Sequence, residues 1–268
     1  MSEQQCAVPA DGDGDAEKAD ARPSTTASPL LDGPQLFARY AFMPNRLAYC
    51  GGDDHRALFD YCVTGVTDAG LCGLLRKFTG AMPYLRLIAE CNAILDPFDE
   101  RVVEAYWLGN DLLQGVEARA LYDSLRARFG RQMRAHDLEL VLGKAPVGAH
   151  PHHSFHVLEV CPRIGWPQAL SFMDHCRISW GKVVSLDGSA LIVEMMPLVI
   201  TGHRLALGSP ERRTVNREFD GNGFVSTARI GDWVSIHWDW ACQVLSLRQV
   251  ANLERWTHYH LNIVNETL

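Results

Sequence analysis

Hydrophobic positions recur every three or four residues through the first half of the chain, which predicts a helical domain over residues 34–148. In the first predicted helix, Leu36, Phe37, Tyr40 and Ala41 share one face. Three later stretches show the same spacing, and their apolar faces are Leu85, Ile88 and Ala89; Val102, Val103, Tyr106 and Trp107; and Leu121, Leu125 and Phe129. Glycine and proline separate these stretches, so we expect short connecting loops.

The pattern changes near residue 149. Alternation over 155–161 predicts a strand, so residues 149–174 are interpreted as a His-rich strand and connector. Two apolar runs flank Asp187-Gly188, a dipeptide typical of a hairpin turn. Further strands are expected at 224–227 and 232–236, and a last helix from about Leu247. We therefore expect an α+β fold, in which the helical domain precedes a small OB-like β-barrel with a C-terminal helix over 175–268.

The N-terminal segment, residues 1–33, has little apolar material and predicts a disordered acidic tail. Its seven acidic and two basic side chains give a net charge of −5, out of −7 for the whole chain of 268 residues. The remaining charge is too close to neutral for general electrostatic binding to nucleic acid or to a membrane. Without an apolar spanning segment or an export signal, the chain is expected to be cytoplasmic.

Two blocks in the C-terminal third resemble the HypC family of small OB-fold chaperones, which act in [NiFe]-hydrogenase maturation. In the first block, Cys176, Gly181 and the Asp187-Gly188 turn fall in the register of that family. The second block, 230–241, contains His237 at the position of the family's histidine. The resemblance covers residues 175–265.

This resemblance implies that Cys176 transiently binds an Fe(CN)2(CO) unit, with His237 as its partner. It also implies two protein partners, a HypD-like scaffold protein and the hydrogenase large subunit. Low-spin ferrous iron with cyanide and carbon monoxide suits a soft thiolate ligand. The expected function is that of a cofactor-assembly chaperone rather than an enzyme. Two departures are that Cys176 is internal and that the segment between the blocks is longer than in the family.

Four histidines within residues 150–156 provide a second candidate site. Along a strand, His150, His152 and His156 would share one face, whereas His153 would lie on the other with Phe155. Such a set could hold zinc or nickel, which makes a metal-dependent enzyme the first alternative function. The competing interpretation of this segment is a solvent-facing loop that enters a strand.

The sequence has eight cysteines, and no two of them form a C-x-x-C motif. Most are interpreted as small buried residues, among them Cys62. Cys50, before two glycines, is a possible second thiol on an exposed loop.

A second alternative function is nucleic-acid binding, because OB folds often bind single strands. Its candidate basic patch consists of Arg204, Arg212, Arg213 and Arg217. The tryptophan-rich face of the barrel is instead expected to pack on the helical domain; it consists of Trp180, Trp233, Trp238 and Trp240.

Overall fold

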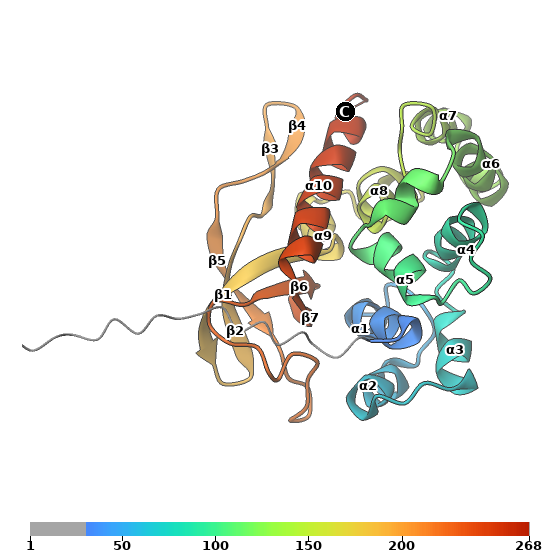
Figure 1. The fold of residues 1–268 in the computed structure, drawn as a ribbon. Coiled ribbons are helices and arrows are strands. Elements are labelled where there is room, and N and C mark those ends of the chain that lie inside the picture. Colours follow the sequence, from blue (N-terminus) through green and yellow to red (C-terminus); the bar gives the residue numbers. More distant parts are fainter. Residues whose placement is uncertain (1–30, 268) are drawn as a thin grey trace, which may run out of the picture.

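A computed structural model describes residues 31–267 and shows an α+β fold with a helical part beside a β-barrel (Figure 1). The helical part contains α1 (Gly33–Arg46), α2 (His55–Thr64), α3 (Ala69–Leu75), α4 (Met82–Cys91), α5 (Glu100–Trp107), the 3-10 helix η1 (Asp111–Gly115), α6 (Ala118–Phe129) and α7 (Ala135–Gly143). A helical connector follows, made of α8 (His153–Phe155), the π-helix η2 (His156–Val160), the 3-10 helix η3 (Cys161–Arg163) and α9 (Leu170–Cys176).

The C-terminal part is a closed five-stranded barrel with one added hairpin and a last helix. Its elements are β1 (Ser179–Asp187), β2 (Ala190–Met195), β3 (Leu198–Thr201), β4 (Arg204–Leu207), β5 (Glu211–Asn216), β6 (Trp233–His237), β7 (Trp240–Leu245) and α10 (Leu247–Val264). The barrel order is β1-β2-β5-β7-β6, with β6 pairing β1 and with β5 parallel to β7. Counted along the chain, the barrel strands follow the order 1-2-3-5-4 of an OB fold, while β3 and β4 form the separate hairpin that lengthens the segment between the two sequence blocks.

The predicted helices with amphipathic stripes correspond to α1, α4, α5 and α6, and the hairpin at Asp187-Gly188 joins β1 to β2. The strand predicted over 155–161 is wrong, because this segment is helical. Every residue from His152 to Cys161 is buried, so the segment has no polar face whose period could distinguish a helix from a strand. No strand forms at 224–227, where Phe224 and Val225 are buried within a loop.

The predicted tail, 1–33, lies mostly outside the described residues. Its last part belongs to the fold, since Asp32 caps α1 by accepting a hydrogen bond from the Gln35 backbone N–H at 2.9 Å and Gly33 begins the helix. No helix within residues 31–267 combines the length and apolar character that crossing a bilayer requires.

One hydrophobic cluster continues from the helical part onto the barrel through α1, while the barrel also has a separate core cluster of its own. Phe42 on α1 contacts Phe59 of α2 on one side and Trp240 of β7 on the other, at ring-centroid distances of 5.0 and 5.1 Å. The Tyr40 hydroxyl is hydrogen-bonded to Ser235 Oγ at 2.9 Å and to Gln243 Oε1 at 3.2 Å, both in the barrel. The expected packing of the tryptophan-rich face is confirmed, because its four tryptophans contact the core that contains the helical part.

The helix α10 is held against the helical part by Trp256, which packs over Gly109 after α5. A Cβ atom on Gly109 would overlap the Trp256 indole, and the φ of Gly109 is +85°. Gly109→Ala should therefore lower the free energy of unfolding by about 2–4 kcal/mol, through a clash and a strained backbone. Chemical denaturation measures this loss.

The control is Gly143→Ala at the end of α7, where a Cβ would have no neighbour within 4 Å. That variant should differ from wild type by less than about 1 kcal/mol. If Gly109→Ala and Gly143→Ala were equally stable, the packing of Trp256 on Gly109 would not contribute to the stability of the fold.

Candidate metal centre

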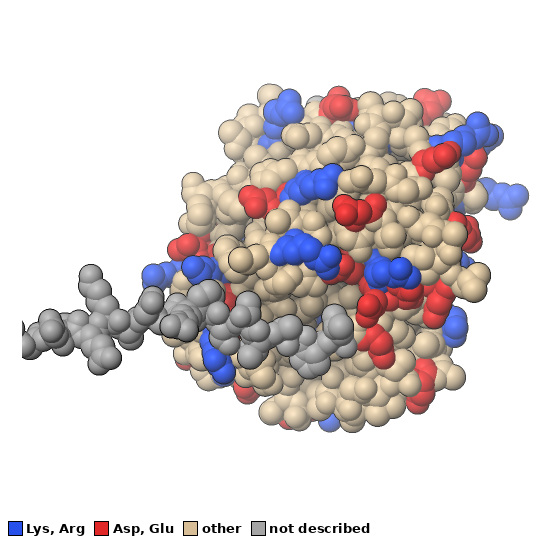
Figure 2. Space-filling view, in the orientation of Figure 1, with Lys and Arg blue, Asp and Glu red and all other residues tan. Residues whose placement is uncertain are grey.

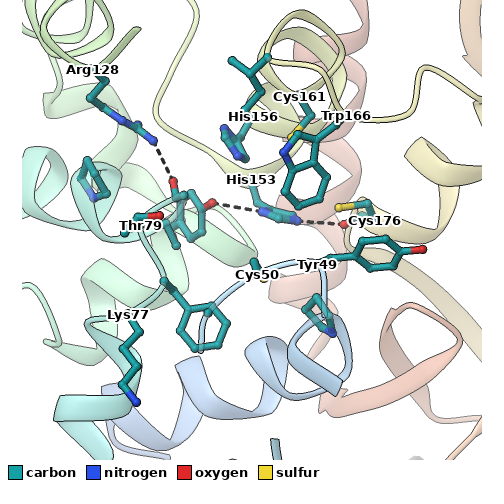
Figure 3. Close-up of a pocket in the computed structure, with 18 of the residues that line it drawn as sticks. Tyr49, Cys50, Lys77, Thr79, Arg128, His153, His156, Cys161, Trp166 and Cys176 are labelled. Carbon is teal, nitrogen blue, oxygen red and sulfur yellow. Dashed lines mark hydrogen bonds between the residues drawn. The ribbon is translucent and has the colours of Figure 1, made fainter. Parts of the chain in front are cut away.

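A cavity of about 520 Å³ lies where the helical part, the helical connector and the barrel meet (Figure 3). Its polar and sulfur-bearing lining comes from loops and element ends of all three: Tyr49, Cys50, Lys77, Thr79, Tyr106, Arg128, Gln132, His153, His156, Cys161, Cys176 and His237. Neither the helical part nor the barrel forms this cavity alone.

Three buried side chains converge in the cavity with potential metal-ligand atoms. His153 begins α8, Cys176 ends α9 and His237 ends β6, and one donor atom of each lies within 4.8 Å of the other two. Two imidazole nitrogens and a sulfur form the kind of donor set that binds zinc, iron, nickel or copper. Cys176 was expected to open a strand, but it closes a helix and β1 begins only at Ser179.

The orientation of His237 is set by a proline in α1. Pro44 has no N–H, so the carbonyl of Tyr40, four residues earlier, lacks its helical donor. The His237 Nδ1–H donates to that carbonyl at 2.7 Å. The carbonyl can only accept, so Nδ1 carries the proton and the neutral ring has its lone pair on Nε2. This buried Nε2 has no hydrogen-bond partner among the described residues, so its lone pair is available to a metal ion.

His153 is held on both sides of its ring. Its Nε2–H donates to the Cys176 carbonyl at 2.9 Å, and the Tyr106 hydroxyl donates to Nδ1 at 3.2 Å (Figure 3). The nitrogen on the Cys176 side is therefore Nε2, and it could bind a metal only after its proton moves to Nδ1, where the Tyr106 hydroxyl oxygen can accept the new hydrogen bond. Such hydrogen bonds fix the tautomer and direction of a ligating imidazole.

Burial keeps all three donors neutral. It raises the pKa of the Cys176 thiol well above its ordinary value and lowers the pKa of His237 to about 4. Burial, and then the proximity of His237, lowers the pKa of His153 well below its ordinary range. A divalent metal would replace the thiol proton, and its charge would stabilise the thiolate that the apolar surroundings disfavour.

The histidine set predicted on one strand face is not brought together. His152 stacks on His260 of α10 at 5.4 Å and contacts Ser154, and His150 packs against Trp256. His156 faces the opposite way, into the cavity, where its Nδ1 meets the Tyr84 hydroxyl. The three histidines lie apart because the segment is helical rather than extended. The helical conformation also places His153, which was assigned to the opposite face of the strand, beside Cys176.

Two further thiols line the cavity beside Cys176. Cys50, expected on an exposed loop, lies in the wall, and burial raises its pKa to about 12. Cys161 at the start of η3 has its pKa raised to about 12 by the same cause. Cys62 is buried in the helical core, as expected.

The basic patch expected for nucleic-acid binding is partly neutralised within the fold. Arg213 donates to Asp174 at 2.8 Å and Arg217 to the Gly188 carbonyl at 2.8 Å. On the face of the molecule shown in Figure 2, Lys and Arg side chains are interspersed with Asp and Glu. A continuous basic track, the usual requirement for binding a phosphate backbone, is not present on that face among the described residues.

Fold and site together define an α+β protein in which a helical part packs against an OB-like barrel, with a buried His-Cys-His cluster between them that could hold a metal ion. The chain belongs to a family of unknown function, DUF6390, whose profile matches residues 29–268. No curated protein and no solved structure matches the chain significantly.

The cluster predicts stoichiometric binding of a transition metal. Cobalt(II) added to the purified protein without oxygen should bind one equivalent and give a thiolate-to-cobalt absorption band. Cys176→Ala should abolish the band, and His237→Ala should weaken binding at least tenfold. Cys62→Ala and His150→Ala are the controls and should bind cobalt as wild type does. Equal loss in Cys62→Ala, or binding that depends on His150 alone, would contradict the assignment.

The same titration has an expected pH dependence. The depressed pKa values leave His153 and His237 unprotonated at pH 6 and above, so only the thiol loses a proton on binding. Between pH 6 and 8 the affinity should therefore rise about tenfold per pH unit. An affinity independent of pH would show that the Cys176 thiol is already ionised.

Pro44→Ala tests the positioning of His237. The new backbone N–H would compete for the Tyr40 carbonyl and loosen the imidazole, so cobalt affinity should fall about tenfold. Stability should be unchanged or higher, because a proline inside a helix costs about 3 kcal/mol. Pro34→Ala in the first turn of α1, where no helical N–H is needed, is the control. A stable Pro44→Ala protein with wild-type affinity would show that this carbonyl does not orient His237.

Proposed function

We propose that this chain binds a transition-metal unit at Cys176, His237 and His153 and transfers it as an accessory protein of [NiFe]-hydrogenase maturation. One observation supports the proposal most. Cys176 and His237, the two residues on which the HypC resemblance depends, lie on separate elements yet place their donor atoms within 4.8 Å in one buried cavity.

The donor set suits the Fe(CN)2(CO) unit that the resemblance implies. A thiolate is a soft ligand for low-spin ferrous iron, and two imidazoles complete a small set of protein ligands. A cavity of about 520 Å³ has room for a metal that retains small ligands of its own. Apolar walls around it favour retention of such a complex over hydrated ferrous iron.

Transfer requires a route between the cavity and a partner protein. Gly51, Lys77 and Gln132 line the cavity and are exposed, so it opens at the surface of the helical part. The proposed partners are a HypD-like scaffold protein as the donor of the iron unit and the hydrogenase large subunit as its acceptor.

The alternative of a metal-dependent enzyme built on His150, His152 and His156 has less support. His150 and His152 lie beside α10, whereas His156 faces the cavity, and the potential ligand group found among the described residues contains none of the three. His152 and His260 stack as neutral rings in the core beside α10, which is a structural role.

The test is hydrogenase maturation in the organism that encodes this chain. Cys176→Ala should leave the fold intact, at a cost of about 1 kcal/mol, and should abolish hydrogenase activity and iron in the large subunit. His237→Ala should reduce activity about 10- to 100-fold, since Cys176 and His153 remain. The measurements are hydrogen uptake and metal content of the purified large subunit.

Cys62→Ala is the matched control, because Cys62 is a buried cysteine that does not line the cavity, and it should mature hydrogenase as wild type does. If Cys176→Ala supports full maturation while remaining folded, the chain has no thiol-based role in this process. The resemblance would then be one of architecture alone.

A further inference from the structure

We propose that the Tyr49 side chain is a gate between the opening beside Gly51 and the Cys176 thiol. In the position that the structure shows, the Tyr49 ring encloses the thiol; when the ring swings outward, a small molecule or a metal complex reaches it. This inference rests on the proposed function for the identity of the cargo, whereas access to the thiol can be measured without any metal. It follows from the ring contacts, the exposure and the backbone conformation around the thiol (Figure 3).

Tyr49 completes an aromatic cover over Cys176. Its ring stacks on Trp238 at a centroid distance of 4.4 Å and meets Phe172 edge-on at 5.2 Å. Phe172, Trp238 and Cys176 belong to one hydrophobic cluster. Figure 3 shows the Tyr49 ring beside the Cys176 side chain. Tyr49 also lines the cavity, so the thiol side of the cavity loses part of its wall when this ring moves away.

The Tyr49 ring can move while the loop that carries it stays in place. Tyr49 is 39% exposed, so solvent lies on the outer side of the stacked ring. The loop backbone is fixed by the buried Asn45, whose side chain donates to the carbonyls of Cys50 and Gly52. The Tyr49 backbone N–H donates to the Pro44 carbonyl at 2.9 Å. Opening therefore requires rotation of one partly exposed side chain, which is faster than rearrangement of a loop.

Backbone strain is concentrated where the cover closes. Ala48, Trp238 and Asp239 have φ values of 59°, 55° and 54°, in the left-handed region that residues with a Cβ seldom adopt. They are three of the five non-glycine residues with positive φ within residues 31–267. Ala48 directly precedes Tyr49, and the other two form the turn after His237 that places the Trp238 ring against Tyr49. Such conformations persist where surrounding contacts maintain them and cluster at functional segments, which supports a built gate.

Alkylation of the metal-free, full-length protein by iodoacetamide tests the gate, with each modified cysteine identified by mass spectrometry. Tyr49→Ala removes the ring and its stacking contacts, so the open fraction and the labelling rate of Cys176 should rise about tenfold. Tyr49→Phe retains the ring and should be labelled at the wild-type rate. Tyr259→Ala on α10 is the matched control and should not change this rate, since Tyr259 is 37% exposed and does not line the cavity.

Cys62 is an internal control in the same samples. It is buried and does not line the cavity, so its labelling rate measures general loosening of the fold and should be the same in Tyr49→Ala and wild type. Equal labelling of Cys176 in Tyr49→Ala and wild type would overturn the inference. An equal rise at Cys176 and Cys62 would overturn it as well, because the variant would then have loosened the whole fold.

Cobalt exchange separates a failure of this inference from a failure of the proposed function. In Tyr49→Ala, cobalt should bind and leave about tenfold faster than in wild type, while its affinity changes by less than about twofold because Tyr49 is not a ligand. The thiolate-to-cobalt band follows both association and release into a chelator. If cobalt does not bind wild type, the metal site is wrong, and alkylation alone decides on the gate. If cobalt binds both proteins at equal rates, the metal site stands and the gate is wrong.

Discussion

The hydrogen bond from His237 to the Tyr40 carbonyl joins the two parts of this protein and prepares its site at the same time. It exists because Pro44 leaves that carbonyl without a helical donor. The bond ties the end of β6 to the middle of α1, and it forces the free lone pair of His237 onto the nitrogen that faces Cys176. This one hydrogen bond thus contributes to docking of the barrel, beside the aromatic contacts of α1, and also prepares a metal donor, which is consistent with a site between the two parts.

Burial then decides the chemistry of the site. The thiol and both imidazoles are neutral without a metal, so this cluster buries no unpaired charge. A divalent metal would enter by displacing the thiol proton, and its own charge would then stabilise the thiolate.

Elements with one buried face and one solvent-exposed face can be predicted from the sequence, because their apolar residues recur with a regular period. Amphipathic spacing located α1 and α10, and the Asp-Gly turn located the hairpin of β1 and β2. The segment 152–161 was assigned wrongly as a strand because its burial on all sides removes the periodic signal. As a result, His153 was not predicted to lie beside Cys176 and His237. Cys176 and His237 came from a resemblance.

The helical part and the connector enclose Cys176, which bears on the proposed function. The resemblance places the cysteine at a chain start, where a partner protein can reach it directly. Here Cys176 follows a helical connector, and Tyr49 stacks on Trp238 over that side of the barrel, with ring centroids 4.4 Å apart. Under the proposed function, a thiol enclosed in this way would retain a small complex between encounters with partners. The same enclosure keeps a partner from contacting the thiol directly, so the proposed transfer would pass through the opening at Gly51 and Gln132.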